Sequence, residues 1–386
     1  MTKKIKRKKL VAFVSPIILG LLSTPALSMH DFTPAGWQAH TPLHLKSTHA
    51  THTPSGMSPA QIKQAYGFPA NLEGAGQVIA IIDAFDDPNI ESDLATFSTQ
   101  FNLPACTTSN GCFTKLYASG SKPGGDTGWG LEMSLDVEWA HAIAPAAKIL
   151  LIEAADNSSG LYEAITVAIH QKATVISLSW GGSEFSQETF YDSSIFGVSP
   201  VPIVAASGDT GNGVWFPAAS PYVVSAGGTQ LTLDSNGNYL SETAWSGSSG
   251  GISAFETEPA YQSIFPIASD TPKRRGVPDV AYNASPGTGY SVYDSFGNGG
   301  WLVVGGTSAS APQWAALIAI MKAAKNGNFG YFNQSLYSVA RTTTLLNDVL
   351  TGTNGNCGYL CTARSGYDYV TGVGSPQAAN LVARFD

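Results

Sequence analysis

Apolar stretches of strand length recur along the chain and are separated by helical patterns. The strand-like stretches are 77–83, 148–154, 174–180, 202–209 and 223–231, and the helical patterns are 131–144, 160–173 and 310–325. Continuous Val, Ile and Leu strands that alternate with helices are typical of a parallel sheet with helices on both faces. The pattern therefore predicts an α/β fold. No internal repeat or linker interrupts residues 57–386, so we expect one large domain there.

The first residues carry the pattern of an export signal. Six Lys and Arg residues precede an apolar run of 13 residues, Leu10–Leu22, and Ala26-Leu27-Ser28 then offers the small residues that signal peptidase prefers. A run of this length is short for a membrane span. We predict a signal peptide over 1–28 and a secreted protein, extracellular or periplasmic, without stable membrane association. An uncleaved membrane anchor is the alternative.

The charge balance argues against some classes of partner. Removal of residues 1–28 would leave 14 Lys and Arg against 28 Asp and Glu, a formal net charge of −14. Such an acidic chain is a poor candidate for binding nucleic acid or an anionic membrane surface.

With 386 residues, 43% of them hydrophobic, the chain can bury a sizeable core. We expect a monomer.

The four cysteines form two local pairs, Cys106 with Cys112 and Cys357 with Cys361. In an exported protein, this arrangement predicts two disulfides that close small loops. A zinc site is the alternative, but these spacings do not match the usual zinc-binding motifs.

Residues 29–56 are polar and hold five of the seven histidines of the chain. A His-rich tract of this kind is a flexible linker, a remnant pro-segment, or a metal-binding or pH-responsive tail. We expect the linker or pro-segment.

A hydroxyl-bearing turn follows two glycines near the end of the chain. Thr307 and Ser308 stand directly before the helical pattern 310–325. A hydroxyl at such a place either caps the helix or acts as a nucleophile, and a serine nucleophile needs a general base within hydrogen-bond reach. Outside the His-rich tract the only histidines are His141 and His170, and His170 lies inside an amphipathic helical pattern.

Two carboxylates offer a different base. Glu132 and Asp136 are four residues apart in a helical pattern, so they lie on one face of the helix. His141 comes nine residues after Glu132 and faces nearly the opposite side. The apolar flanks favour burial, and buried neighbouring carboxylates share a proton; a solvated acidic face is the alternative. Asp209 follows an apolar strand in a glycine-rich turn, where it either forms the turn or faces a site.

The ordered motifs of the chain resemble those of one family. The motifs are ISLSWGG (176–182), SGDTG (207–211), AWSGSSGGIS (244–253) and GGTSASAP (305–312), together with the helix that carries Glu132 and Asp136. They resemble the sedolisins, or serine-carboxyl peptidases, which are acid-acting relatives of subtilisin, over about residues 58–386. The resemblance implies a subtilisin-like parallel sheet with helices on both faces in a single catalytic domain. Sedolisins usually carry a long N-terminal prodomain, whereas here residues 29–56 alone separate the expected signal peptide from the domain.

The resemblance also implies a role for each matching residue. Ser308 would be the nucleophile, Glu132 its general base, Asp136 the support of Glu132, and Asp209 the acid that stabilises the oxyanion. A carboxylate base can work at a pH where histidine would be protonated. An oxyanion donor must carry its proton, which also favours acidic pH.

Further residues are implied around this centre. Asp83 and Trp180 would belong to the outer part of the acid network, and Ser179, Trp180 and Gly181 would pair with the substrate backbone as an added strand.

A calcium site is implied near the C-terminus by the stretches 347–352 and 363–376. One Ca²⁺ ion would take two carboxylates and three backbone carbonyls, which are the hard oxygen ligands that calcium prefers. These ligands would be Asp348, Val349, Arg364, Gly366 and Asp368. Ordinary turn residues are the alternative.

We therefore expect a secreted, calcium-binding serine-carboxyl endopeptidase that cuts peptides or denatured proteins at acidic pH. Removal of tripeptides from an N-terminus is an alternative activity on the same fold. A catalytically silent binding protein, a His-rich metal-binding surface protein and a hydrolase that depends on His141 also remain open.

Overall fold

The computed structural model describes residues 31–47, 49–265, 273–325, 329, 331–342 and 344–385, which belong to one compact unit, Asp31–Asp386. The expected signal peptide over 1–28 lies outside the described residues. Within the described part of the chain, no helix is both long and apolar enough to cross a membrane.

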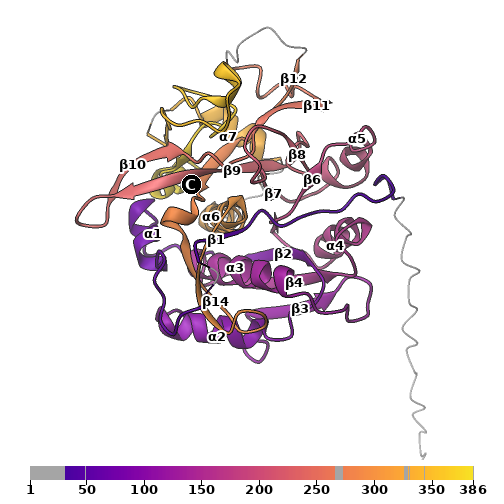
Figure 1. Ribbon diagram of the computed structural model, residues 1–386, viewed down its shortest axis with the longest axis vertical. Coiled ribbons are helices and arrows are strands. Elements are labelled where there is room, and N and C mark those ends of the chain that lie inside the picture. Colours follow the sequence, from indigo (N-terminus) through magenta and orange to yellow (C-terminus); the bar gives the residue numbers. More distant parts are fainter. Residues whose placement is uncertain are drawn as a thin grey trace, which may run out of the picture. The chain divides into compact units, whose positions relative to one another are not determined.

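An eight-stranded sheet forms the centre of the fold (Figure 1). Seven of its strands run parallel, and β10 is antiparallel at one edge. The order across the sheet is β10-β9-β7-β5-β2-β4-β3, with β13 also paired to β9. The strands are β2 (Val78–Ala84), β3 (Phe113–Tyr117), β4 (Lys148–Ala154), β5 (Val175–Leu178), β7 (Ile203–Ala206), β9 (Val224–Leu233), β10 (Tyr239–Ala244) and β13 (Val280–Asn283). The predicted α/β fold with a parallel sheet is confirmed.

Helices flank this sheet. They are α1 (Pro59–Ala65), α2 (Ile90–Gln100), α3 (Thr127–Ile143), α4 (Ser159–His170), α5 (Thr189–Tyr191), α6 (Ser310–Lys325), α7 (Phe332–Val339) and α8 (Ala378–Arg384). The central helices α3 and α6 pack against each other and against the strands β2, β5 and β7 (Figure 1). Both are buried on nearly all sides, as expected of helices with apolar residues around most of their circumference.

Smaller sheets complete the structure. The pairs are β6 (Gly182–Ser183) with β8 (Trp215–Phe216), β11 (Gly251–Thr257) with β12 (Arg274–Val277), and β16 (Leu346–Asn347) with β17 (Ser375–Pro376). A three-stranded sheet joins β1 (His44–Leu45), β15 (Gly300–Gly305) and β14 (Tyr290–Asp294) in that order. Through β1, the His-rich tract is part of the folded unit, and it lies against the strand that leads to Ser308.

Both predicted disulfides are confirmed. Cys106 and Cys112 are bonded, with their Cα atoms 4.9 Å apart, and Cys357 and Cys361 are bonded, with their Cα atoms 5.3 Å apart. Each bond closes a short loop. Because all four cysteines are bonded, the described part of the chain contains no free thiol.

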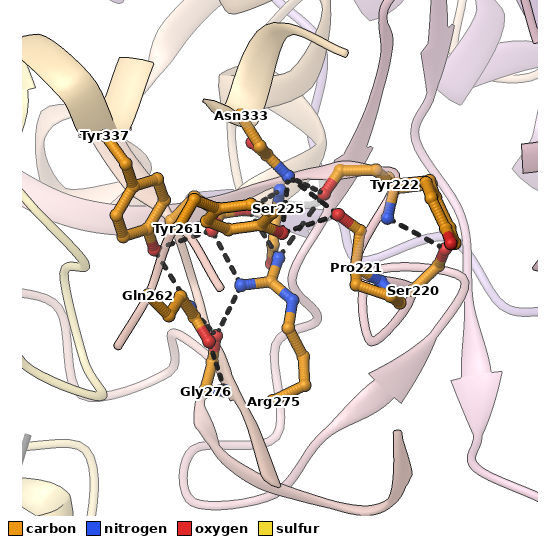
Figure 2. A network of polar contacts seen from close by, with 12 residues as sticks. Ser220, Pro221, Tyr222, Ser225, Tyr261, Gln262, Arg275, Gly276, Asn333 and Tyr337 are labelled. Atoms are coloured by element: carbon orange, nitrogen blue, oxygen red, sulfur yellow. Dashed lines mark hydrogen bonds and ion pairs between the residues drawn. The ribbon is translucent and has the colours of Figure 1, made fainter. Parts of the chain in front are cut away.

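A buried ion pair organises the region between β12 and α7 (Figure 2). The guanidinium of Arg275 donates to both carboxylate oxygens of Asp279 at 2.6 and 2.7 Å, and both side chains are fully buried. Gln262 donates from Nε2 to the Gly276 carbonyl at 2.7 Å and to the Tyr337 hydroxyl at 2.9 Å. The attraction between the two charges and their hydrogen bonds offset the large cost of removing both groups from water, and removal of either partner alone would leave an uncompensated buried charge.

Candidate active site

Ser308 lies on a short 3₁₀ turn, Thr307–Ala309, between the end of β15 and the start of α6. Its side chain is fully buried. Its hydroxyl donates to the Ser179 carbonyl at 3.4 Å, and its backbone N–H donates to the Pro42 carbonyl at 3.2 Å. The preceding Gly306 has φ +121°, and a Cβ there would stand 2.1 Å from the Pro42 oxygen, so only glycine fits.

Helix α3 places Glu132 and Asp136 next to Ser308. Both carboxylates are fully buried, and Asp136 accepts a hydrogen bond from the Ser179 hydroxyl at 2.7 Å. Burial, and then the charge of Asp83, raise the pKa of Glu132, while the neighbouring Ser308 hydroxyl acts to lower it. Burial and the charges of Asp83 and Glu132 also raise the pKa of Asp136. The fold therefore brings the predicted nucleophile, base and supporting acid together.

Asp83 extends this acid network beneath α3. It lies on β2, fully buried, directly opposite Glu153 of β4, and its carboxylate oxygens have no hydrogen-bond partner among the described residues. Burial and the charge of Glu153 raise the pKa of Asp83. The Nζ atom of Lys115 is 2.7 Å from Glu153. The four carboxyl groups of Glu132, Asp136, Asp83 and Glu153 cannot all ionise together, so the network retains protons.

Trp180 supports the same region from the end of β5. Its indole N–H donates to the Ile82 carbonyl at 2.9 Å, and its side chain is fully buried. This bond fixes the ring against β2, one residue before Asp83.

Asp209 reaches the site from the loop after β7. One carboxylate oxygen accepts hydrogen bonds from the Thr307 backbone N–H at 2.8 Å and from the Thr307 hydroxyl at 2.7 Å. The other oxygen lies 3.3 Å from His44 Nε2. Burial raises the pKa of Asp209 to about 8, although the two bonds from Thr307 act to lower it. Asp209 is therefore a neutral acid, able to donate a hydrogen bond, over most of the pH range below 8.

Residues 179–181 run alongside the site as an edge that accepts an extended chain. Gly181 exchanges two backbone hydrogen bonds with His40, at 2.8 and 3.1 Å, as an isolated antiparallel bridge. Ser179 also makes a contact that was not predicted from the sequence. Its hydroxyl donates to Asp136 and orients that carboxylate.

The two histidines outside the N-terminal tract are engaged elsewhere. His141 is buried on α3 with Nε2 2.8 Å from the Pro104 carbonyl oxygen, and burial lowers its pKa. His170 is exposed in the last turn of α4.

The residues of the expected calcium site also lie together. Asp348 accepts from the Gly366 backbone N–H at 3.0 Å, and Asp368 accepts from the Arg364 backbone N–H at 2.9 Å. Within the described residues, nothing donates to the carbonyl oxygens of Val349, Arg364 and Gly366. Two carboxylates and three free carbonyls fit the oxygen preference of calcium.

A second acidic cluster was not predicted from the sequence. Carboxylate oxygens of the buried residues Asp87, Asp93 and Asp294 all lie within 4.8 Å of one another. Asp93 accepts hydrogen bonds from the backbone N–H and the hydroxyl of Ser295, each at 2.7 Å. Burial raises the pKa of Asp87 to about 7. These three carboxylates could hold a metal ion or share protons.

Comparisons with known proteins agree with this geometry. The model of the subtilase family matches residues 120–363. Kumamolisin from Bacillus sp. (strain MN-32) is 34% identical over 365 residues, which cover 85% of this chain and 63% of that relative. Sedolisin from Pseudomonas sp. (strain 101) is 28% identical over 373 residues, which cover 87% of this chain and 62% of that relative. The chain thus spans less than two thirds of the length of either protein.

Solved structures give the same result. Pseudomonas sedolisin, a serine-carboxyl proteinase complexed with two molecules of pseudo-iodotyrostatin, superposes with a TM-score of 0.74 at 29% identity and covers 86% of this chain and 98% of that one. A psychrophilic protease, S41, shares the fold alone, with a TM-score of 0.54 at 21% identity, covering 85% of this chain and 99% of that one. The chain belongs to the subtilase family, on its sedolisin and kumamolisin branch.

Proposed function

We propose that the chain is a serine-carboxyl endopeptidase that hydrolyses peptide bonds of peptides and denatured proteins at acidic pH. One observation carries the proposal: Ser308, Glu132 and Asp209 converge from three separate elements, and among the described residues no histidine acts on the pKa of Glu132. The relatives named kumamolisin and sedolisin support the same reaction class.

In the proposed reaction, the Ser308 hydroxyl oxygen attacks the substrate carbonyl carbon, and its proton passes to Glu132. Asp136, whose carboxylate accepts a hydrogen bond from the Ser179 hydroxyl, assists Glu132 in accepting this proton and returning it. The backbone N–H of Ser308 and the protonated Asp209 donate to the oxyanion. Glu132 then gives the proton to the leaving amine, and water releases the acyl group from Ser308 by the reverse path.

Two carboxyl groups with opposite needs set the pH range of the proposed reaction. Asp209 must be protonated to donate, and burial raises its pKa to about 8, which sets the alkaline limit. Glu132 must be ionised to accept a proton. Burial and the charge of Asp83 raise the pKa of Glu132, while the Ser308 hydroxyl acts to lower it, so the acid limit lies where Glu132 releases its proton. The proposal of activity in acid rests on the resemblance to the acid-acting sedolisins.

A digest of denatured protein from pH 2 to pH 8 tests the proposal, with the products sequenced and the Ser308→Ala variant as the blank. We expect internal cleavage that requires Ser308 and is stronger in acid than at pH 8. Release of tripeptides alone would indicate the tripeptidyl-peptidase activity instead. No cleavage at any pH by a folded protein would leave a silent binding protein.

We further propose one calcium ion held by Asp348, Asp368 and the carbonyls of Val349, Arg364 and Gly366. Such an ion would cross-link two loops that are close in space and supply no catalytic group. The Lys and Arg residues and the apolar run within residues 1–28 support export of the protein into surroundings where calcium is plentiful.

Asp348→Ala is expected to lower the Tm by about 5 °C or more, because bound calcium stabilises only the folded state. A chelator should have the same effect on the wild type and little further effect on the variant. Ser365→Ala is the matched control, because its hydroxyl donates to Asp348 at 3.2 Å without offering a proposed ligand. A Tm that is insensitive to chelator, with no calcium in the purified protein, contradicts the site.

A cluster of four carboxyls near β11 should make the fold more stable in acid. Glu184, Glu188, Asp192 and Glu256 are largely buried, and burial is the main cause that raises each pKa, to about 6 for Asp192, about 8 for Glu256 and about 10 for Glu188. The folded chain therefore holds protons that the unfolded chain releases above about pH 4. The resulting stability is complete below that pH, declines as the pH rises through the folded-state pKa values of about 6 and about 8, and is fully lost only above about pH 10.

We expect the Tm to fall by about 5 °C or more between pH 4 and pH 8. Glu188→Gln keeps a neutral side chain at every pH and should reduce this fall, whereas exposed Glu163→Gln should not. Scanning calorimetry at both pH values measures the difference. Parallel pH profiles for wild type and Glu188→Gln would show that this cluster does not control acid stability.

A further inference from the structure

The second acidic cluster lies in a buried space where α2, α3 and β14 pack against one another (Figure 1). Asp87 comes from the loop after β2, Asp93 from the first turn of α2, and Asp294 from the end of β14. None of the three residues is more than 2% exposed, and each brings a carboxylate oxygen within 4.8 Å of the other two. The fold thus gathers three carboxyls from segments that are far apart in the sequence.

Backbone N–H groups orient all three carboxylates. Each accepts one such bond, at 2.8 Å for Asp87, 2.7 Å for Asp93 and 3.0 Å for Asp294. Bonds of this kind favour the ionised form of a carboxyl group. Hydrogen-bond donors also hold the ligating carboxylates of metal sites in position. The cluster is therefore arranged to present negative charges close together, and such an arrangement needs a cation.

No described side chain supplies that cation. Lys115 approaches from β3, but its Nζ atom donates to the backbone carbonyl of Asp87 at 2.6 Å. The ion pairs of Lys115 are with Asp86 and Glu153, at 2.8 and 2.7 Å. Among the described residues, no ion pair involves a carboxylate of the second acidic cluster.

A fourth buried carboxyl faces the cluster from α3. Glu138 is fully buried, and its Oε2 atom accepts the Tyr293 N–H at 3.1 Å, whereas its Oε1 atom has no hydrogen-bond partner among the described residues. Burial, and then the charges of the three aspartates, raise the pKa of Glu138, although the bond from Tyr293 acts to lower it. The Oδ2 atom of Asp87 is likewise buried without a partner. These two oxygens indicate a positive group that the protein chain itself does not provide.

We propose that Asp87, Asp93 and Asp294 bind one Ca²⁺ ion, at a site separate from the calcium site proposed near the C-terminus. Calcium holds oxygen ligands at about 2.4 Å, so two ligands on opposite sides of the ion are about 4.8 Å apart. The oxygens of the cluster lie within that span. Mg²⁺ fits a buried site less well, because it keeps several of its water molecules. Glu138 is not among the ligands and adds negative charge beside them.

The ion would join the loop after β2, the helix α2 and the end of β14. The backbone N–H of Asp87 also donates to Glu153 at 3.2 Å, so the same loop is fixed against β4. Only the folded chain brings the three carboxylates together. The bound ion would therefore stabilise the folded state, and it would take no part in the chemistry at Ser308.

The main experiment counts the calcium ions that the full chain binds in equilibrium dialysis. It is done at pH 7.5, where protons compete less with the ion. Asp87→Asn places an amide at the unpartnered Oδ2 position and leaves Oδ1 to accept its backbone N–H. We expect Asp87→Asn to bind one ion fewer than the wild type, Asp348→Ala also one fewer, and the double variant two fewer.

The matched control is Asp156→Asn. Asp156 is exposed, and it accepts the backbone N–H groups of Ser158 and Gly160 at 2.9 and 3.1 Å. The control thus removes one charge from a carboxylate with similar hydrogen bonds, and it should bind as many ions as the wild type. Circular dichroism checks that every variant is folded.

A second measurement leaves the cluster unchanged, so it does not depend on the folding of Asp87→Asn. Calcium added to Asp348→Ala should raise the Tm by about 3 °C or more, because the ion binds only the folded state. Adding Asp87→Asn to this variant should abolish the rise. Magnesium at the same concentration should not replace calcium.

Equal calcium counts for wild type, Asp87→Asn and Asp156→Asn overturn the inference, and so does an Asp348→Ala protein that binds no calcium. In either case the carboxyls of the second acidic cluster share protons instead. The inference does not depend on the proposed peptidase function. If Asp348→Ala binds as many ions as the wild type while Asp87→Asn loses one, the site near the C-terminus fails and this site stands.

Discussion

Replacement of Glu132 by glutamine is expected to lower kcat by a factor of about 10²–10⁴, the usual contribution of a positioned general base. The amide has the shape of the carboxyl group but cannot accept the Ser308 proton. Because the side chain is fully buried against α6 and the sheet, water is a poor substitute for it. KM should change little, since Glu132 does not lie on the edge 179–181. Steady-state rates measured over a range of peptide concentrations at acidic pH give the two constants separately.

The matched control is Glu138→Gln on the same helix. Glu138 is also fully buried, but it accepts a hydrogen bond from the Tyr293 backbone N–H at 3.1 Å on another side of α3. The Glu138→Gln variant should have a lower free energy of unfolding but an unchanged kcat per folded molecule. Near-wild-type kcat in a folded Glu132→Gln protein would remove Glu132 from the mechanism and reopen the choice of base.

The pairing of Glu132 with Asp136 could be predicted because it depends only on local geometry. Residues four apart share a face wherever a helix forms, and the apolar flanks indicated that this helix is buried. The parallel sheet was predictable for a similar reason, since its buried strands are continuous apolar runs such as 148–154, which became β4 without change.

The partners of these residues could not be predicted, because they depend on the register between distant elements. Ser179 reaches Asp136 only because β5 ends beside α3, and Asp83 meets Glu153 only because β2 and β4 pair in that register. Likewise, the sequence marks Thr307 only as a neighbour of the nucleophile, yet its backbone N–H and its hydroxyl both donate to Asp209.

The N-terminal tract shows the limit of composition as a guide. The five histidines and few apolar residues of 29–56 predict a linker or pro-segment. Nothing in that pattern predicts that Pro42 lies against Ser308. The pairing of β1 with β15 joins residues about 260 positions apart, and such contacts arise from the folded surface rather than from local sequence preference.

Asp209 provides the second large effect. Asp209→Ala is expected to lower kcat/KM about 10²–10³-fold, the usual cost of one oxyanion donor. Asp209→Asn should retain more activity than Asp209→Ala, because the amide donates a hydrogen bond at every pH. The difference in kcat/KM between these two variants shows how much of the effect comes from the lost hydrogen bond rather than from the lost side-chain volume.

The pH profile distinguishes this role from a structural one. Burial raises the pKa of Asp209 to about 8, so wild-type activity should fall as the pH rises past that value and the carboxylate, now ionised, repels the oxyanion. The alkaline limb should move upward in Asp209→Asn, which cannot ionise. A purely structural Asp209, holding Thr307 in place, would lower activity by the same factor at every pH. Superimposable profiles for wild type and Asp209→Asn, measured on folded proteins, would therefore assign the oxyanion to the Ser308 N–H and some other donor.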